Sequence, residues 1–236
     1  MHRIIATLLL SAVAGVSSAQ SLRFHGHGVN DIDRVKIRID PHVPVDVGAT
    51  DFTIDFWMRA NAADNRTRVG CAANGESWTN GAIIIDRALW ESTDHGFYGL
   101  ALFGGSTGRL SFGVFKGGAW DAGLCGLRNV ADGLWHHVAI TRSVSTGRIR
   151  LYVDGALDGQ TSGPAGNVSY RDGQPSRVPS YINNNVENYL VFGAEKFDAD
   201  NTRYPSYNGY LDEMRYSTTL RWTYMEIGRA SCRERV

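Results

Sequence analysis

Residues 195–201, with the sequence EKFDADN, place carboxylate and amide oxygens within seven residues, including those of Glu195 and Asp198. Calcium takes six to eight hard oxygen ligands and accepts backbone carbonyls among them. The segment therefore predicts a calcium site, and the alternative interpretation is a solvated acidic turn. A second candidate is a structural ion held by Asp31 or Asp33 near the start of the chain together with Asp212 near its end.

Aromatic residues in loop-like segments form the next group of candidate ligand contacts. Carbohydrate recognition uses aromatic faces together with directional polar groups. We select Trp120 in segment 118–123, and Tyr204 and Tyr207 in segment 204–208, as ligand-binding candidates. The other aromatic residues of loop-like segments are Trp78, Trp90, Tyr170 and Tyr181. The alternative for each is a lid over the core, and Trp57 and Trp135 are expected to be packing residues because they lie in alternating segments.

Two patterns resemble catalytic motifs but have simpler interpretations. Residues 104–108 (GGSTG) match the Gly-x-Ser-x-Gly elbow of hydrolases, but a strand pattern follows where that motif needs a helix, so we expect a hairpin turn. The pairs His25/His27 and His136/His137 lack a third ligand or a sequence-local Ser, Cys or carboxylate partner. This argues against a metal site or a triad at either pair.

Alternation of apolar and polar residues identifies the elements that would position these side chains. In the hairpin predicted at 134–155, Ile149, Leu151 and Val153 share one face. Segment 51–60 repeats the rule, with Trp57 and Arg59 on its polar face. Further strands are predicted at 35–39, 82–86, 97–103, 110–115, 189–192 and within 208–220. Short strands separated by Gly, Asn, Asp and Ser turns predict an all-β chain, long enough for one sandwich.

Three motifs follow one another in the second half of the chain: WHHVA with a strand ending in YVDG, then FGAEKFDADN, then GYLDEMR. Together they resemble the laminin G-like and pentraxin-like domains of the concanavalin A-like lectin/glucanase superfamily, over about residues 21–223. The resemblance implies a two-sheet antiparallel jelly-roll sandwich with calcium on one rim and a bound carbohydrate or other surface ligand. In pentraxins an Asp-Asn pair from an earlier loop joins the acidic loop around calcium, which adds Asp64 and Asn65. The acidic loop here departs from the pentraxin pattern by one inserted residue.

The same superfamily includes retaining glucanases, whose carboxylate pair lies on one strand as Glu-x-Asp-x-x-Glu or a close variant. No such string occurs in this chain, and the adjacent Asp212 and Glu213 would point to opposite faces of a strand. We therefore expect a non-catalytic, exported binding module for glycan or another extracellular surface ligand. The alternatives are a glycan-active hydrolase and a structural module of a larger surface protein.

Both ends of the chain differ from the rest. Residues 1–19 combine a basic start, an apolar run and a small-residue exit, which predicts a secretory signal peptide, and no apolar run is long enough to span a bilayer. Residues 225–236 resemble an artefact, because EIGRASCRERV is a translation of a common sequencing adapter. The jelly-roll domain is then 20–224, the natural chain is expected to continue further, and the expected location is secreted, periplasmic or cell-surface.

Removing these ends changes the charge and the cysteine count. Four Arg and two Glu are lost, which leaves 20 basic and 22 acidic residues and a net charge of about −2. The remaining chain has no basic field that would favour nucleic acid. Two cysteines remain, Cys71 and Cys125, and an even number in an exported chain predicts a disulfide, with two buried thiols as the alternative.

Overall fold

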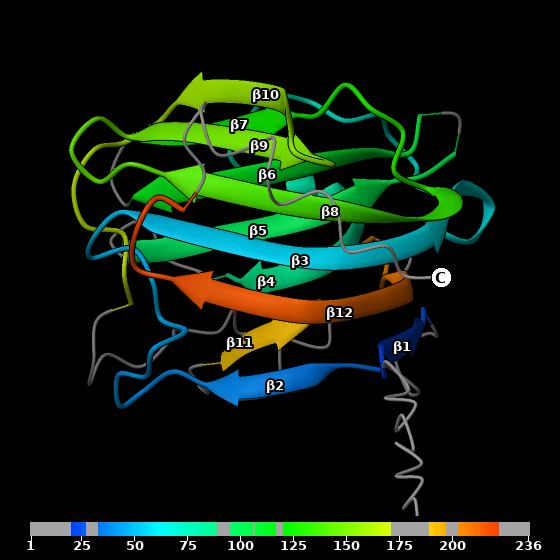
Figure 1. Cartoon of the computed structure of the whole chain (residues 1–236), viewed down its shortest axis with the longest axis horizontal. Coiled ribbons are helices and arrows are strands. Elements are labelled where there is room, and N and C mark those ends of the chain that lie inside the picture. The colour runs from blue at the N-terminus through cyan, green and yellow to red at the C-terminus, as the bar shows by residue number, and fades with distance from the viewer. Residues whose placement is uncertain are drawn as a thin grey trace, which may run out of the picture.

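The computed structural model describes residues 20–26, 33–88, 95–105, 107–116, 120–170, 189–196 and 203–221. Two antiparallel sheets of six strands face one another, with one sheet toward the viewer in Figure 1 and the other behind it. The all-β jelly-roll sandwich expected from the sequence is confirmed. No helix in these ranges is long and apolar enough to cross a membrane.

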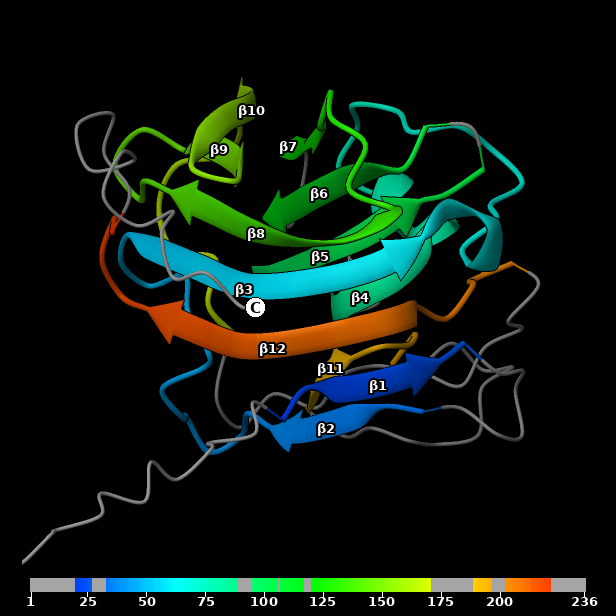
Figure 2. The same ribbon diagram turned by 45° about the vertical axis from the view of Figure 1, so that its right-hand side comes forward.

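The front sheet has the strand order β1, β12, β3, β8, β9, β10, and the 45° turn in Figure 2 shows β1 beside β12. Its strands are β1 (Leu22–His25), β12 (Asn208–Ser217), β3 (Phe52–Asn61), β8 (Asp132–Arg142), β9 (Arg148–Val153) and β10 (Ala156–Ser162). The back sheet has the order β2, β11, β4, β5, β6, β7. Its strands are β2 (Val35–Arg38), β11 (Tyr189–Phe192), β4 (Ala82–Arg87), β5 (His95–Phe103), β6 (Arg109–Lys116) and β7 (Trp120–Cys125).

The core lies between the two sheets and follows the alternation of the strands. In β3, Ile54, Phe56 and Met58 point inward and are fully buried. They join Val138 and Ile140 of β8 and the inward residues of the back sheet in one apolar cluster. The opposite side of β3 therefore faces outward, as the period of two in the sequence requires.

A second, smaller cluster covers the outer face of the back sheet. Trp78, in the short 3-10 helix Ser77–Asn80, is completely buried against Ile83, Ala101 and Phe103. This close approach is possible because three glycines, Gly99, Gly113 and Gly123, pair with one another in register across β5, β6 and β7. A Cβ atom at any of these glycines would overlap the segment that lies on the sheet.

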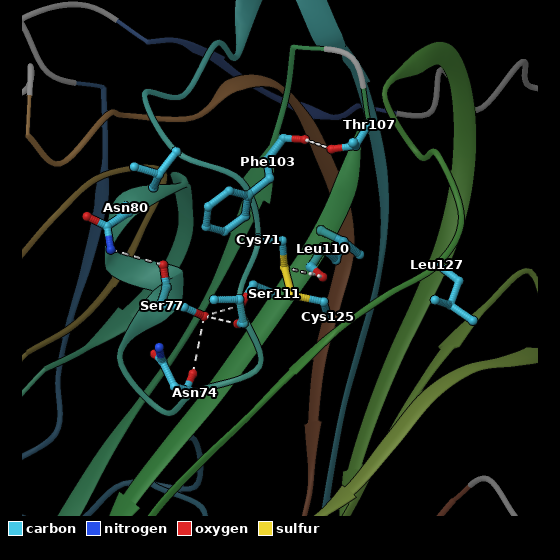
Figure 3. Close-up of a disulfide and its surroundings, with 12 residues drawn as sticks. Cys71, Asn74, Ser77, Asn80, Phe103, Thr107, Leu110, Ser111, Cys125 and Leu127 are labelled. Carbon is cyan, nitrogen blue, oxygen red and sulfur yellow. Dashed lines mark hydrogen bonds between the residues drawn. A yellow bond between two sulfur atoms is a disulfide. The ribbon is translucent and has the colours of Figure 1, made fainter.

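The disulfide between Cys71 and Cys125 joins this covering segment to β7, as Figure 3 shows. The two Cα atoms are 6.0 Å apart, an ordinary separation for a disulfide. Within the segment, Ser77 Oγ lies 3.1 Å from Ser111 Oγ of β6. The predicted disulfide is confirmed, and it fixes the segment that buries Trp78.

Most of the strands expected from the local sequence pattern are present in the structure. The predicted strands at 35–39, 51–60, 82–86, 97–103, 110–115 and 189–192 appear as β2, β3, β4, β5, β6 and β11, and the hairpin appears as β8 and β9. Residues 104, 105 and 107, between β5 and β6, are in turn conformation, as expected. Segment 118–123 was predicted as a loop, which is wrong for residues 120–123, because β7 pairs with β6 through residues 120–125.

Candidate functional site

The outer face of the front sheet carries a row of four side chains, each from a different strand. Arg23 of β1 pairs in register with Tyr210 of β12, Tyr210 pairs with Arg59 of β3, and Arg59 pairs with Trp135 of β8. Paired residues of antiparallel strands point to the same face, so the four side chains are neighbours. We call Arg23, Tyr210, Arg59 and Trp135 the cation–aromatic row.

Contacts within the row are cation–π interactions. The Arg59 guanidinium carbon lies 4.4 Å from the centre of the Tyr210 ring and 5.3 Å from that of Trp135, and the Arg23 guanidinium carbon lies 4.9 Å from the Tyr210 ring. All four side chains are half-buried. Each such contact contributes about 0.5–2 kcal/mol, more as the pair is removed from water. The row is therefore held in one arrangement before any ligand arrives.

A pocket of about 300 Å³ opens beside the row. Its side chains come from β1, β3 and β12 and from the residues that follow β3. They are Arg23, Arg59, Ala60, Asn61, Asp64, Asn208 and Tyr210. Gly133 and Gly209 also line it and contribute no side chain, which leaves the space open. The volume is at the lower end of the range for small-molecule sites, and the lining is mainly polar.

Asn65 was predicted as a metal ligand, but in the structure its side chain makes hydrogen bonds to backbone groups. Asn65 is buried, and its amide nitrogen donates to the carbonyl oxygens of Asn61 at 2.9 Å and Asn208 at 2.7 Å. Its amide oxygen accepts the Asn208 backbone N–H at 2.9 Å. The side chain is thus committed to backbone groups and ties the loop after β3 to the start of β12, which shapes the pocket wall.

Asp64, the other half of the predicted Asp-Asn pair, is exposed at the pocket. The Asn61 side-chain amide donates to its carboxylate at 3.2 Å. Asp64 is therefore the carboxylate among the residues that line this pocket, beside two arginines. Its role as a calcium ligand stays a prediction.

The remaining metal candidates fall in separate places. Glu195 is half-buried, and its charge raises the pKa of Arg34, although burial lowers that pKa more. Asp212 accepts the Glu213 backbone N–H at 2.7 Å on the outer side of β12. Asp198 and Asp31 lie outside the described residues. Within the described ranges no three His, Cys, Asp or Glu side chains are grouped to hold a metal ion.

The predicted ligand-binding aromatics have different outcomes. Tyr207 is completely buried, so the prediction that it offers an exposed face to a ligand is wrong. Its hydroxyl donates to the backbone oxygens of Arg59 at 3.3 Å and Tyr210 at 3.2 Å. Burial raises the pKa of Tyr207. Tyr207 instead supports the row from inside the sandwich. Tyr204 is half-buried against the Trp78 cluster. The Trp120 side chain lies outside the described part of the structure, although its backbone belongs to β7.

Other aromatic residues also differ from their sequence interpretation. Trp78 and Tyr170 were grouped with loop aromatics but are buried, at 0% and 6% exposure. Trp57 and Trp135 were expected to pack, and both are half-buried on the outer face of the front sheet. The sequence did contain a signal for this, since the alternation in segment 51–60 already placed Trp57 and Arg59 on the polar face.

His136 pairs in register with the inward-pointing Met58, so it lies on the opposite face of β8 from Trp135, and it bridges two carboxylates that the sequence did not indicate. Its Nδ1 is 2.8 Å from Asp154 Oδ2 and its Nε2 is 3.0 Å from Asp132 Oδ1. Burial lowers the pKa of His136, but the hydrogen bonds to Asp154 and Asp132 outweigh it, so the pKa is raised. We call His136, Asp132 and Asp154 the histidine clamp.

His137, on the outward side of the same strand, packs its ring against Trp57 at 5.3 Å and lies 3.7 Å from Asp55. Arg215 Nε lies 3.1 Å from both carboxylate oxygens of Asp55. Burial raises the pKa of Asp55, but the hydrogen bonds from His137 and Arg215 outweigh it, so the carboxylate is held ionised. Asp55 is thus a structural ion-pair partner two rows away from the cation–aromatic row on the same face of the sheet.

Comparison with known families agrees with the observed fold. A laminin G-like family model, described as the concanavalin A-like lectin/glucanases superfamily, matches residues 34–222. The chain belongs to this superfamily. A comparison with curated proteins gives no match.

Solved structures of the superfamily fold include several similar to this chain at low sequence identity. A native heptameric SAP-like pentraxin from Limulus polyphemus has a TM-score of 0.56 and 13% identity, covering 89% of this chain and 80% of its own. The LG1-3 region of the laminin alpha2 chain has a TM-score of 0.50 and 14% identity, covering 84% and 31%. A botulinum neurotoxin type C structure has a TM-score of 0.51 and 11% identity, covering 84% and 38%. These likenesses show the sandwich fold.

Proposed function

We propose that this chain is a non-catalytic carbohydrate-binding module that works outside the cytoplasm and holds its saccharide at the cation–aromatic row. The observation that carries the proposal is the polar pocket beside the half-buried Tyr210 and Arg59. Saccharide sites combine an aromatic face with several polar donors and acceptors. Tyr210, Asn61, Asn208 and the two arginines offer this combination within one pocket.

The arrangement of the two sheets favours the front sheet for this role. The outer face of the back sheet is occupied by the segment that carries Trp78, which the disulfide joins to β7. The outer face of the front sheet carries Trp57, Trp135 and Tyr210 half-exposed to solvent. A ligand that needs an aromatic surface therefore finds it on the front sheet.

Binding without hydrolysis is supported by the state of the carboxylates. A retaining glycosidase needs two carboxyl groups about 5 Å apart, one with a raised pKa as the acid. Asp86 has its pKa raised to about 6 by burial, but it is completely enclosed and accepts backbone N–H groups of Lys196 and Ala88. Asp55 is held ionised by Arg215. Neither matches an acid that protonates a leaving group beside the pocket.

Calcium remains part of the proposal through residues 195–201. Lys196, which follows Glu195, is anchored because its backbone N–H donates to Asp86 at 2.7 Å and its ammonium donates to the Ala88 carbonyl at 3.2 Å. This fixes the start of the acidic segment to β4. We propose that Glu195 and Asp198 contribute to a calcium site there and that Asn65 does not.

Export and the ligand class have independent support. The predicted signal peptide and the Cys71–Cys125 disulfide both suit an oxidising, extracytoplasmic location. Among the similar structures, botulinum neurotoxin type C depends for its cell entry upon interaction with two ganglioside molecules. A protein with a similar fold therefore uses a glycan-bearing ligand, and we propose the same ligand class for this chain.

The test is a glycan array followed by calorimetric titration of the best ligand. Tyr210→Ala should weaken binding at least about tenfold, because it removes both the ring and the support of two arginines. Tyr189→Ala is the matched control, since Tyr189 lies on β11 of the back sheet, where its ring centre is 5.5 Å from the Lys36 ammonium. Folded protein that binds no saccharide would reject the proposal and favour a structural module. Release of reducing ends that stops when carboxylates are replaced would reject its non-catalytic part.

A further inference from the structure

The Arg59 guanidinium has no acceptor inside the described part of the protein. Its guanidinium carbon lies 4.4 Å from the centre of the Tyr210 ring and 5.3 Å from that of Trp135, and no hydrogen bond or ion pair joins it to another described residue. Arg215, on the same face of the sheet, is engaged by Asp55. The N–H groups of the Arg59 guanidinium therefore remain available to the pocket that it lines.

Arg23 places a second positive charge on the same pocket. It donates to the Gly209 carbonyl at 3.1 Å and to the Asn208 amide oxygen at 2.7 Å. These bonds fix its guanidinium and use only part of its five N–H donors. The pocket lining thus has two arginines against one carboxylate, Asp64, which already accepts a hydrogen bond from Asn61.

We propose that this pocket recognises the anionic group of a terminal acidic sugar, either a carboxylate or a sulfate ester, and that Arg59 is its principal donor. The proposal rests on the saccharide-binding function given above. A guanidinium presents its donors as a planar fork that matches these anions in a bidentate manner. The two rings hold Arg59 in place beforehand, so little side-chain freedom is lost when the anion binds.

The size of the pocket suits a single acidic residue rather than a long polyanion. The pocket volume of about 300 Å³ also suits the end of a saccharide.

The experiment compares matched pairs of oligosaccharides with the full chain. One pair ends in a uronic acid or in the corresponding neutral hexose, and the other ends in a sulfated sugar or its unsulfated form. We expect at least tenfold tighter binding of one acidic member than of its neutral partner. This preference should fall as the salt concentration rises from about 50 to about 500 mM, because salt screens the charges. Arg59→Gln should remove that preference, and Arg59→Lys should restore only part of it, because a lysine keeps the charge without the fork.

A matched control is Arg148→Gln, at the exposed start of β9 on the same sheet, which should leave the preference unchanged. Thermal melting of each variant checks the fold. Equal binding of acidic and neutral partners, or a preference that survives in folded Arg59→Gln, would overturn this inference and leave the proposed function standing. Binding of neither member of either pair, together with a blank glycan array, would overturn both.

Discussion

Replacing His136 with glutamine should destabilise the protein at pH 6 and have little effect at pH 9. The imidazole lies between two carboxylates, 2.8 Å from Asp154 and 3.0 Å from Asp132. Only the protonated ring can donate to both, since a neutral imidazole has one donor and turns a lone pair toward the second carboxylate. The clamp therefore depends on the charge of His136.

The direction of the pH dependence of stability follows from the raised pKa of His136. The hydrogen bonds raise the pKa of folded His136 above its value of about 6.5 in the unfolded chain. The stabilisation is then fully present below pH 6.5 and is lost as the pH rises through the folded value. The pKa of Asp132 is lowered, because its hydrogen bonds with Leu134 and His136 outweigh the effect of burial, so its share is lost only as the pH falls through that lowered value.

The free energy that the histidine clamp contributes depends on how far its side chains are exposed to solvent. Hydrogen bonds between charged groups contribute about 1.5–3 kcal/mol each when shielded. Here the ring is 13% exposed but the carboxylates of Asp132 and Asp154 are 37% and 41% exposed, so solvent screening reduces the pair to about 1–2 kcal/mol in total. With a urea m-value of about 2–3 kcal/mol/M, the midpoint should differ by about 0.5 M.

Urea unfolding of the wild type and His136→Gln at several pH values between 5.5 and 9.5 provides the assay. The difference between the two midpoints should be largest near pH 6 and approach zero near pH 9. His42→Gln is the control, because His42 is 58% exposed and 3.6 Å from Asp46. A difference that stays constant across the whole pH range would refute a charged clamp and indicate a packing role for the ring.

Three further predictions concern the metal, the disulfide and the pocket charge. Calcium at a concentration of about a hundredfold its Kd should stabilise the folded chain by about 2.7 kcal/mol, which raises the Tm by roughly 5–10 °C. Asp198→Asn should reduce that rise in Tm. Equal Tm values with calcium and with chelator would exclude the site. Serine at both Cys71 and Cys125 should cost about 4 kcal/mol in urea unfolding, given their sequence separation of 54, and an unchanged midpoint would contradict this. Asp64→Asn should tighten acidic-sugar binding by about two- to fivefold, whereas loss of the calcium-dependent Tm shift would assign Asp64 to the metal.

Local pattern was sufficient for strands that are buried on one side and bounded by turn residues. The alternation of segment 51–60 predicted β3, and the even cysteine count with an export signal predicted the disulfide. It was insufficient for β7, whose sequence WDAGLC reads as a turn because it contains Gly and Asp. Pairing with β6 overrides that weak local preference, and no local rule contains the partner strand.

The candidate site was missed because it depends on register between distant segments. Arg23, Arg59, Trp135 and Tyr210 are spread over almost the whole chain and become neighbours only through the pairing of β1, β12, β3 and β8. The outward face of one strand can be predicted from its own residues. Which outward residues of other strands lie beside it cannot, since a shift of two residues preserves the alternation and changes every neighbour.

The register of strand pairing also explains why the two outer faces of the sandwich differ. In the back sheet, register aligns Gly99, Gly113 and Gly123, and the absence of side chains there lets the segment with Trp78 lie directly on the strands. In the front sheet, the corresponding outward positions of one row carry two arginines and two large rings. Such a row occupies the space that a covering segment would need and keeps polar groups directed toward solvent. The front sheet is therefore the face on which this chain can meet a ligand.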